Sequence, residues 1–183
     1  MLVSTGVVAI AEIGDKTQLL ALLLTARFRA PWPIVAGILV ATLANHAFAS
    51  AVGSYLVTLA GPQTVRWILG LSFIVMAAWT LIPDSAPDEK SSAPRHGIFL
   101  TTLVAFFLVE MGDKTQIATV ALAAQFHSIV LVVLGTTLGM LLANVPVVFA
   151  GEALMRRVPL GAVRIVAALS FVALGLYVLL AAP

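Results

Sequence analysis

Long apolar runs separated by short polar turns make up most of the chain, and their lengths predict six membrane-spanning helices. A helix that crosses the hydrocarbon core needs about 20 mostly apolar residues. Prolines, glycines or basic residues stand in the turns, where they end a helix or face water. The predicted helices cover residues 2–26, 32–59, 65–82, 98–124, 129–150 and 162–180.

The chain also repeats itself. The segment from Glu12 to Gln18 recurs from Glu110 to Gln116, an offset of 98 (110 − 12 = 98). Residues 65–66 and 71–73 recur at the same offset, and so does a glycine at 37. The pair Ala-Asn at 44–45 recurs instead at 143–144, an offset of 99 (143 − 44 = 99), which predicts a one-residue slip.

This duplication predicts an architecture. Residues 1–82 form a first three-helix repeat, residues 83–97 a Pro- and Ser-rich linker, and residues 98–183 a second three-helix repeat. Because three is an odd number, the second repeat enters the membrane from the opposite side. The predicted fold class is therefore an all-α integral membrane protein with six transmembrane helices in two inverted repeats, as in secondary transporters.

Composition narrows the function. With 61% hydrophobic and 10% charged residues and a mean hydropathy of +1.10, the chain is unlike a soluble domain. The net charge of +2 forms no basic face, which excludes a nucleic-acid partner. Cysteine is absent, so there is no disulfide and no thiolate metal site. The first run lacks a basic start and contains Glu12, so we expect it to remain in the mature protein.

The distribution of Lys and Arg predicts the orientation, because cytoplasmic loops carry an excess of both. Outside the repeated motifs, one side of the membrane holds seven such residues and the other holds only Arg66. The seven-residue side, which includes the linker, should be cytoplasmic. We therefore expect a multi-pass protein of the cell membrane, the inner membrane in a bacterium, with both termini outside the cytoplasm. The seven are Arg27, Arg29, Lys90, Arg95, Arg156, Arg157 and Arg164.

The repeated motif places charges where a membrane helix tolerates them least. A charge at the centre of such a helix costs about 2.5–3.5 kcal/mol, so these positions predict a functional site. If each motif continues one helix, its acids and lysine share a face, and its glycine lies opposite, against a neighbouring helix. Four carboxylates and two ammonium groups then carry a net charge of −2, which one divalent cation would neutralise.

Oxygen ligands suit Mg²⁺, Ca²⁺ and Mn²⁺. The predicted metal ligands are the four motif acids with two helix-interior asparagines, and the other polar motif residues support them. His46 is the only histidine inside a predicted helix, and we interpret it as a packing residue; Thr17 and Thr115 are expected to bond to their own helix backbone. The ligand set is Glu12, Asp15, Glu110, Asp113, Asn45 and Asn144, and the supporting set is Lys16, Lys114, Gln18, Gln116, Thr17 and Thr115.

Simpler interpretations of these residues remain. Glu12–Lys16 and Glu110–Lys114 have the spacing of ion pairs within one helix. The two asparagines have equal claims as interhelical hydrogen-bonding residues. Asp84, Asp88 and Glu89 are interpreted as part of a solvated linker, with ion recruitment as the alternative.

Two copies of Glu-x-Gly-Asp-Lys-Thr in a six-helix chain closely resemble the small cation-transporter family of the MneA-type manganese exporters and the Golgi manganese/calcium transporters. The resemblance spans the chain and both motifs, 12–17 and 110–115. It implies that the four motif acids bind the transported ion. It also implies export of Mn²⁺, or of Ca²⁺ in some members, by exchange with protons or another ion.

We therefore predict a Mn²⁺ exporter that works by cation/proton antiport and has no cofactor and no enzymatic activity. Its partners are the divalent ion, protons and the lipid bilayer, and a homo-oligomer is left open. The first alternative is a Ca²⁺/H⁺ exchanger of the same fold. The others are an intramembrane metal-dependent hydrolase, which lacks a repeated Ser or His beside the acids, and a channel, which the neighbouring lysines disfavour.

Overall fold

The computed structural model describes residues 1–82, 97–126, 128–151 and 159–181, and in these ranges every regular element is an α-helix. The first repeat contains α1 (Leu2–Glu12), α2 (Lys16–Phe28), α3 (Pro31–Leu59) and α4 (Pro62–Thr80). The second contains α5 (Gly97–Glu110), α6 (Lys114–Phe126), α7 (Ile129–Ala150) and α9 (Leu160–Ala181). The predicted linker, apart from Gly97, lies outside the described residues, as do Arg156 and Arg157.

The continuous helices predicted over 2–26 and 98–124 are wrong: each is broken inside the motif. The helix α1 ends at Glu12 and α2 begins at Lys16, while α5 ends at Glu110 and α6 begins at Lys114. Gly14 and Gly112 adopt φ of +80° and +78°, a left-handed conformation that interrupts a right-handed helix and that glycine adopts without strain. Both glycines are thus the points at which the helices break, and not packing positions within them.

The other four predicted helices are confirmed, with bounds that differ by a few residues. Three helices in the described part of the chain are long and apolar enough to cross a membrane: Pro31–Leu59, Ile129–Ala150 and Leu160–Leu180. The half-helices Leu2–Glu12 and Gly97–Glu110 are apolar but shorter. The described part of the chain is therefore all-helical, with three helices that could cross a membrane and two shorter apolar helices that end at the breaks.

The two repeats pack against each other in matching ways. A Cβ on Gly37 of α3 would lie 2.7 Å from Thr102 Cβ and 2.9 Å from the Phe99 carbonyl oxygen, both on α5. A Cβ on Gly135 of α7 would lie 3.1 Å from Ser4 Cβ on α1 and 2.8 Å from the carbonyl oxygen of the neighbouring Met1. The two sets of contacts are equivalent: Gly135 is 98 positions after Gly37, and Ser4 and Met1 are 98 positions before Thr102 and Phe99. The duplication in sequence is therefore a duplication of helix contacts.

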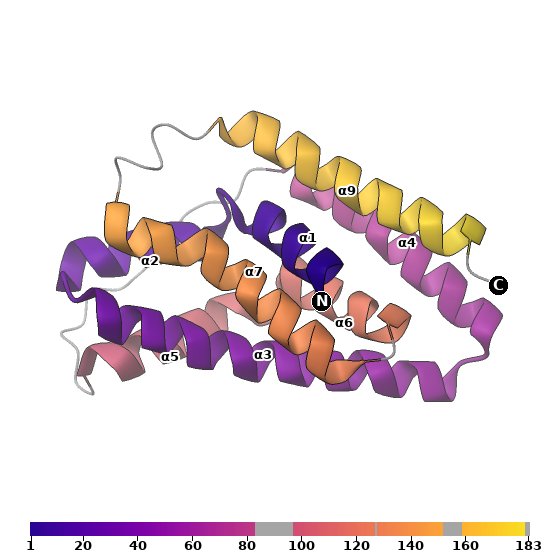
Figure 1. Ribbon diagram of the computed structural model, residues 1–183, viewed down its shortest axis with the longest axis horizontal. Helices are drawn as coiled ribbons and strands as arrows, with labels where there is room; N and C mark the ends of the chain where they lie inside the picture. The colour runs from indigo at the N-terminus through magenta and orange to yellow at the C-terminus, as the bar shows by residue number, and fades with distance from the viewer. Residues whose placement is uncertain (83–96, 127, 152–158, 182–183) are drawn as a thin grey trace.

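The helices α4 and α9 break this symmetry. They pack side by side along one edge of the molecule, where Phe73 stacks on Phe171 at a centroid distance of 6.3 Å (Figure 1). From that edge α4 packs against α6 and α9 packs against α1. The half-helices α2 and α5 instead make their main contacts with α7 and α3. The pair α4–α9 thus packs against one half of each broken helix, α6 in one case and α1 in the other.

Candidate metal site between the two broken helices

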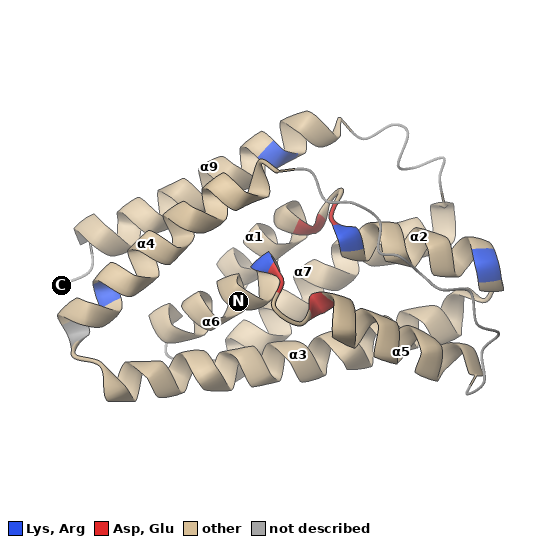
Figure 2. Ribbon diagram, turned by 180° about the vertical axis from the view of Figure 1, so that it is seen from behind, with Lys and Arg blue, Asp and Glu red and all other residues tan. Residues whose placement is uncertain are grey.

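The two helix breaks meet in the interior of the bundle, and they bring the acidic residues of both motifs together there (Figure 2). Glu12 and Glu110 are the last residues of α1 and α5, and Asp15 immediately precedes α2. All four motif acids are at most 1% exposed. The predicted meeting of the two motifs is confirmed, and the breaks are what turn the acids inward.

Three of the acids form a tight group. Glu12, Asp15 and Asp113 each offer a carboxylate oxygen, and these oxygens lie within 4.8 Å of one another. Glu12 Oε1 is buried and has no hydrogen-bond partner among the described residues. Buried carboxylate oxygens at this separation suit a hard divalent cation, which takes oxygen ligands at about 2.0–2.6 Å. The group draws on both repeats, because Asp113 belongs to the second motif.

The lysines pair across the repeats and not along one helix. Lys16 Nζ lies 3.0 Å from Asp113 Oδ1, and Lys114 Nζ forms an ion pair with Asp15 Oδ1. The side chain of Lys16 is 27% exposed, whereas that of Lys114 is 3% exposed. Asp15 and Asp113 are therefore each paired with an ammonium group from the opposite repeat.

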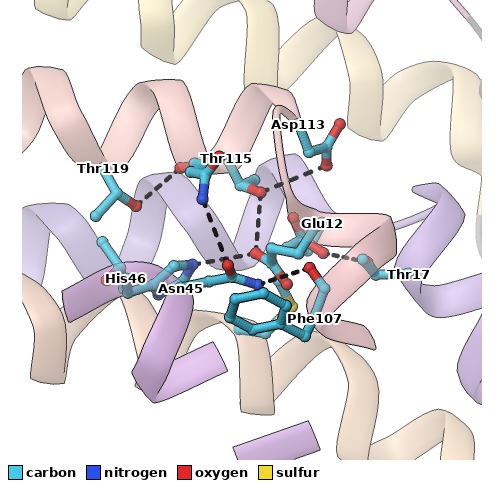
Figure 3. Close-up of polar contacts among 12 residues, drawn as sticks. Glu12, Thr17, Asn45, His46, Phe107, Asp113, Thr115 and Thr119 are labelled. Atoms are coloured by element: carbon cyan, nitrogen blue, oxygen red, sulfur yellow. Dashed lines mark hydrogen bonds and ion pairs between the residues drawn. The ribbon is translucent and has the colours of Figure 1, made fainter. Parts of the chain in front are cut away.

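The threonines of the motifs bind carboxylates, contrary to the prediction that they bond to their own backbone. Thr17 Oγ1 donates to Glu12 Oε2. Thr115 Oγ1 lies 3.4 Å from Glu110 Oε1 and 3.5 Å from Asp113 Oδ2 (Figure 3). Because the helix breaks between the acid and the threonine, the hydroxyl can turn back toward the preceding helix end. The threonines therefore orient the acids.

The glutamines stabilise the breaks. The N–H of Gly14 donates to Gln18 Oε1, and the N–H of Gly112 donates to Gln116 Oε1, both at 2.7 Å. The amide nitrogen of Gln18 also donates to the Ala143 carbonyl oxygen at 2.9 Å. That of Gln116 lies 3.4 Å from Asn45 Oδ1. Each glutamine thus connects its own break to the long helix of the other repeat.

These bonds also correct the alignment of the repeats. Gln18 and Gln116 differ by 98, and so do their partners, positions 143 and 45 (143 − 45 = 98). The one-residue slip predicted from the asparagines is therefore absent at this point, and the two asparagines are not equivalent positions. Asn144 corresponds to His46 (144 − 46 = 98), and Asn45 corresponds to Ala143.

The three residues at these positions differ in their contacts. Asn45 donates to the Phe107 carbonyl oxygen at 3.1 Å. Asn144 donates to the Met140 carbonyl oxygen at 3.1 Å, while its own Oδ1 is buried without a hydrogen-bond partner. The fully buried His46 places Nε2 3.1 Å from Glu110 Oε1 (Figure 3). His46 therefore contacts a motif acid, although it was interpreted from the sequence as a packing residue.

A narrow cavity lies beside the first motif. Thr80 of α4 and Arg164 of α9 line it together with Asp15 and Lys114. Arg164 was assigned from the sequence only to the basic side of the membrane. The structure places it at the same cavity as Asp15.

Comparisons with known proteins found similar sequences. Residues 1–88 and 98–183 match the family model described as "Divalent cation/proton antiporter GDT1". A Vibrio cholerae serotype O1 protein named "Putative manganese exporter" is 50% identical over 180 residues, which are 98% of this chain and 86% of the relative. A GDT1-like protein of Synechocystis sp. is 27% identical over 138 residues, 64% of this chain and 66% of that protein. No solved structure matches the chain.

Proposed function

Because the chain belongs to the family of GDT1 divalent cation/proton antiporters, we propose that it exports Mn²⁺ from the cytoplasm in exchange for protons at the site between the two helix breaks. The relative that is 50% identical is named for manganese export, which favours Mn²⁺ over Ca²⁺ as the transported ion. The ion is the substrate of this protein and not a resident cofactor.

The single observation that carries this proposal is the group formed by Glu12, Asp15 and Asp113, whose carboxylate oxygens lie within 4.8 Å of one another in the protein interior. Glu110 completes the set of motif acids from the second repeat. Asn144 Oδ1, buried without a partner, is a further oxygen that an ion would satisfy. Asn45 already uses its amide group in two contacts, so we assign it a supporting role beside the breaks.

Charge explains why one ion exchanges for another. Four carboxylates and two ammonium groups sum to −2, and such an excess is unfavourable in a membrane interior. One Mn²⁺ or two protons cancel it, so the two ligands compete for the same oxygens. Metal ligands must be deprotonated, so metal binding releases protons and weakens as the pH falls. Inward movement of protons then drives the metal outward.

Lys16 and Lys114, which each pair with the aspartate of the other repeat, suggest how the exchange of ions begins. One ammonium group lies against Oδ1 of each aspartate. A metal ion that binds Oδ1 of either aspartate must move the ammonium group off that oxygen, while the ammonium charge stays near the site and counts in its balance. Lys16, which is partly exposed, can turn toward water more easily than the buried Lys114. We infer that ion entry begins with the release of Lys16 from Asp113.

The orientation predicted from the basic residues assigns α1 and α6 to the outer half of the membrane, and α2 and α5 to the cytoplasmic half. If each residue is exchanged for its counterpart in the other repeat, 98 positions away, the helix contacts of this structure give a second possible arrangement. The packing of α4 on α6 and of α9 on α1 then becomes packing of α9 on α2 and of α4 on α5. Alternating access would be the movement of the α4–α9 pair between these two positions.

Transport by the purified protein in proteoliposomes tests the proposal. We expect Mn²⁺ uptake that an opposing pH gradient drives, with Ca²⁺ and Mg²⁺ as slower substrates. A Glu12→Gln, Glu110→Gln variant that folds normally should be inactive. Full activity of that variant, or Mn²⁺ movement that no pH gradient affects, would contradict the proposal.

A further inference from the structure

We propose that His46 is a direct nitrogen ligand of the transported metal ion and that it favours Mn²⁺ over Ca²⁺. This inference rests on the proposed function, because it concerns the same site between the two motifs. It goes beyond the oxygen ligands that the motifs provide, because His46 lies on α3, outside both motifs.

The first argument is the position of the ring. His46 Nε2 lies 3.1 Å from Glu110 Oε1, and both side chains are fully buried. Two adjacent ligand atoms in an octahedral site with bonds of about 2.1 Å lie about 3 Å apart. The nitrogen and the carboxylate oxygen therefore have the separation of neighbouring ligands around one ion. Nε2 donates to the Glu110 carboxylate, so binding of a metal ion through Nε2 requires the ring hydrogen to move to Nδ1, which has no hydrogen-bond partner among the described residues.

The second argument is the symmetry of the repeats. At an offset of 98, His46 of α3 corresponds to Asn144 of α7. Asn144 Oδ1 is buried and has no hydrogen-bond partner in the part of the chain that the structure describes. The two long helices thus carry His46 and Asn144 at equivalent positions, and His46 contacts Glu110, the motif acid that lies outside the group of Glu12, Asp15 and Asp113.

The third argument concerns the chemistry of the ions. Ca²⁺ and Mg²⁺ are hard cations that take oxygen ligands almost throughout. Mn²⁺ also prefers oxygen but, as a first-row transition metal, it accepts imidazole. A site of oxygens alone distinguishes Mn²⁺ from Ca²⁺ only by size and ligand number. One imidazole among the oxygens adds binding free energy for Mn²⁺ that Ca²⁺ does not gain.

Exchange of the two equivalent residues tests the proposal. His46→Asn makes the two long helices alike, and we expect it to weaken Mn²⁺ binding about tenfold or more while Ca²⁺ binding changes little. The double variant His46→Asn, Asn144→His returns one imidazole to the site from the other repeat and should recover much of the Mn²⁺ preference. The measurement is equilibrium binding of Mn²⁺ and Ca²⁺ to purified protein.

A spectroscopic measurement separates ligation from support. Electron spin echo modulation of bound Mn²⁺ should show a directly bound nitrogen in the wild type and none in His46→Asn. If His46 only holds Glu110 in place, asparagine can donate the same hydrogen bond, and the wild type will lack the nitrogen signal. Mn²⁺ bound without nitrogen modulation overturns this inference and leaves the proposed function intact. Absence of any Mn²⁺ binding by the wild type overturns the proposed function itself.

Discussion

The two motifs have the same sequence pattern, but their glutamates have different surroundings. Glu12 accepts a hydrogen bond from Thr17, keeps Oε1 unpartnered and groups with the two aspartates. Glu110 instead contacts His46 and lies outside that group. The duplication provides a symmetric frame, and single differences on the long helices then make the two halves of the site unequal.

The largest effect on transport is expected from the motif aspartates, and it should be the same in both repeats. Asp15→Asn and Asp113→Asn should each reduce Mn²⁺ transport by about 100-fold or more, because removing one partner of a buried ion pair costs about 3–5 kcal/mol and a carboxylate ligand is lost as well. Uptake in proteoliposomes measures the effect. Asp88→Asn, in the predicted linker, is the control and should transport normally. An active Asp15→Asn beside an inactive Asp113→Asn would show that the crossed ion pairs are not equivalent.

Substitution of the two motif lysines should lower the thermal stability by different amounts in the two repeats. Lys114→Gln removes the ammonium group with a side chain that is 3% exposed, whereas Lys16→Gln removes one that is 27% exposed. We expect Lys114→Gln to cost about 3 kcal/mol or more and to lower Tm by about 6–12 °C, and Lys16→Gln to lower it by about 2–4 °C. Thermal unfolding in detergent measures both shifts. Equal shifts would contradict the difference in burial.

The two break glycines provide a matched pair. Alanine at either position must adopt a positive φ, at a cost of about 1–2 kcal/mol. At Gly14 the new Cβ would also lie 2.8 Å from Leu160 Cδ2, whereas at Gly112 no atom of the described residues, apart from its chain neighbours, lies within 4 Å. Gly14→Ala should therefore be the more destabilising in thermal unfolding, and adding Leu160→Ala should remove the excess. If Gly112→Ala were as harmful as Gly14→Ala, contact with α9 would not be the cause.

The glutamines should give the smallest difference. Gln18→Ala loses a 2.9 Å bond to the Ala143 carbonyl oxygen, and Gln116→Ala loses a 3.4 Å contact with Asn45. Both variants also lose the bond to the break glycine. We expect Gln18→Ala to be less stable than Gln116→Ala by up to about 1 kcal/mol, measured by thermal unfolding. The reverse order would mean that the longer contact contributes more in the membrane.

The sequence predicted the helical class, the duplication and the meeting of the two motifs, because these follow from apolar runs and a fixed offset. It failed at the breaks because apolar periodicity is the same for one long helix and for two short ones end to end. The signal was present in the order of residues: a glycine followed by Asp15, a residue type that favours the start of a helix.

The partners within the site could not be predicted in the same way. Helix spacing offered an ion pair of Lys16 with Glu12 as the simpler alternative, but the break removes that spacing, and Lys16 pairs instead with Asp113 of the other repeat. His46 could have been found by adding 98, which gives Asn144, but the neighbouring pair at 99 obscured that match. The assignment of individual ligands remains a prediction.

The interruption of α1 and α5 has a consequence for the electric field at the centre of the protein. An unbroken helix presents its partial charges only at the membrane surfaces, but a broken one presents two further ends in its middle. The C-terminal ends of α1 and α5 offer carbonyl oxygens with a combined dipole that attracts cations, and the N-terminal ends of α2 and α6 oppose it. This part of the field belongs to the backbone. Neither protonation nor side-chain substitution removes it.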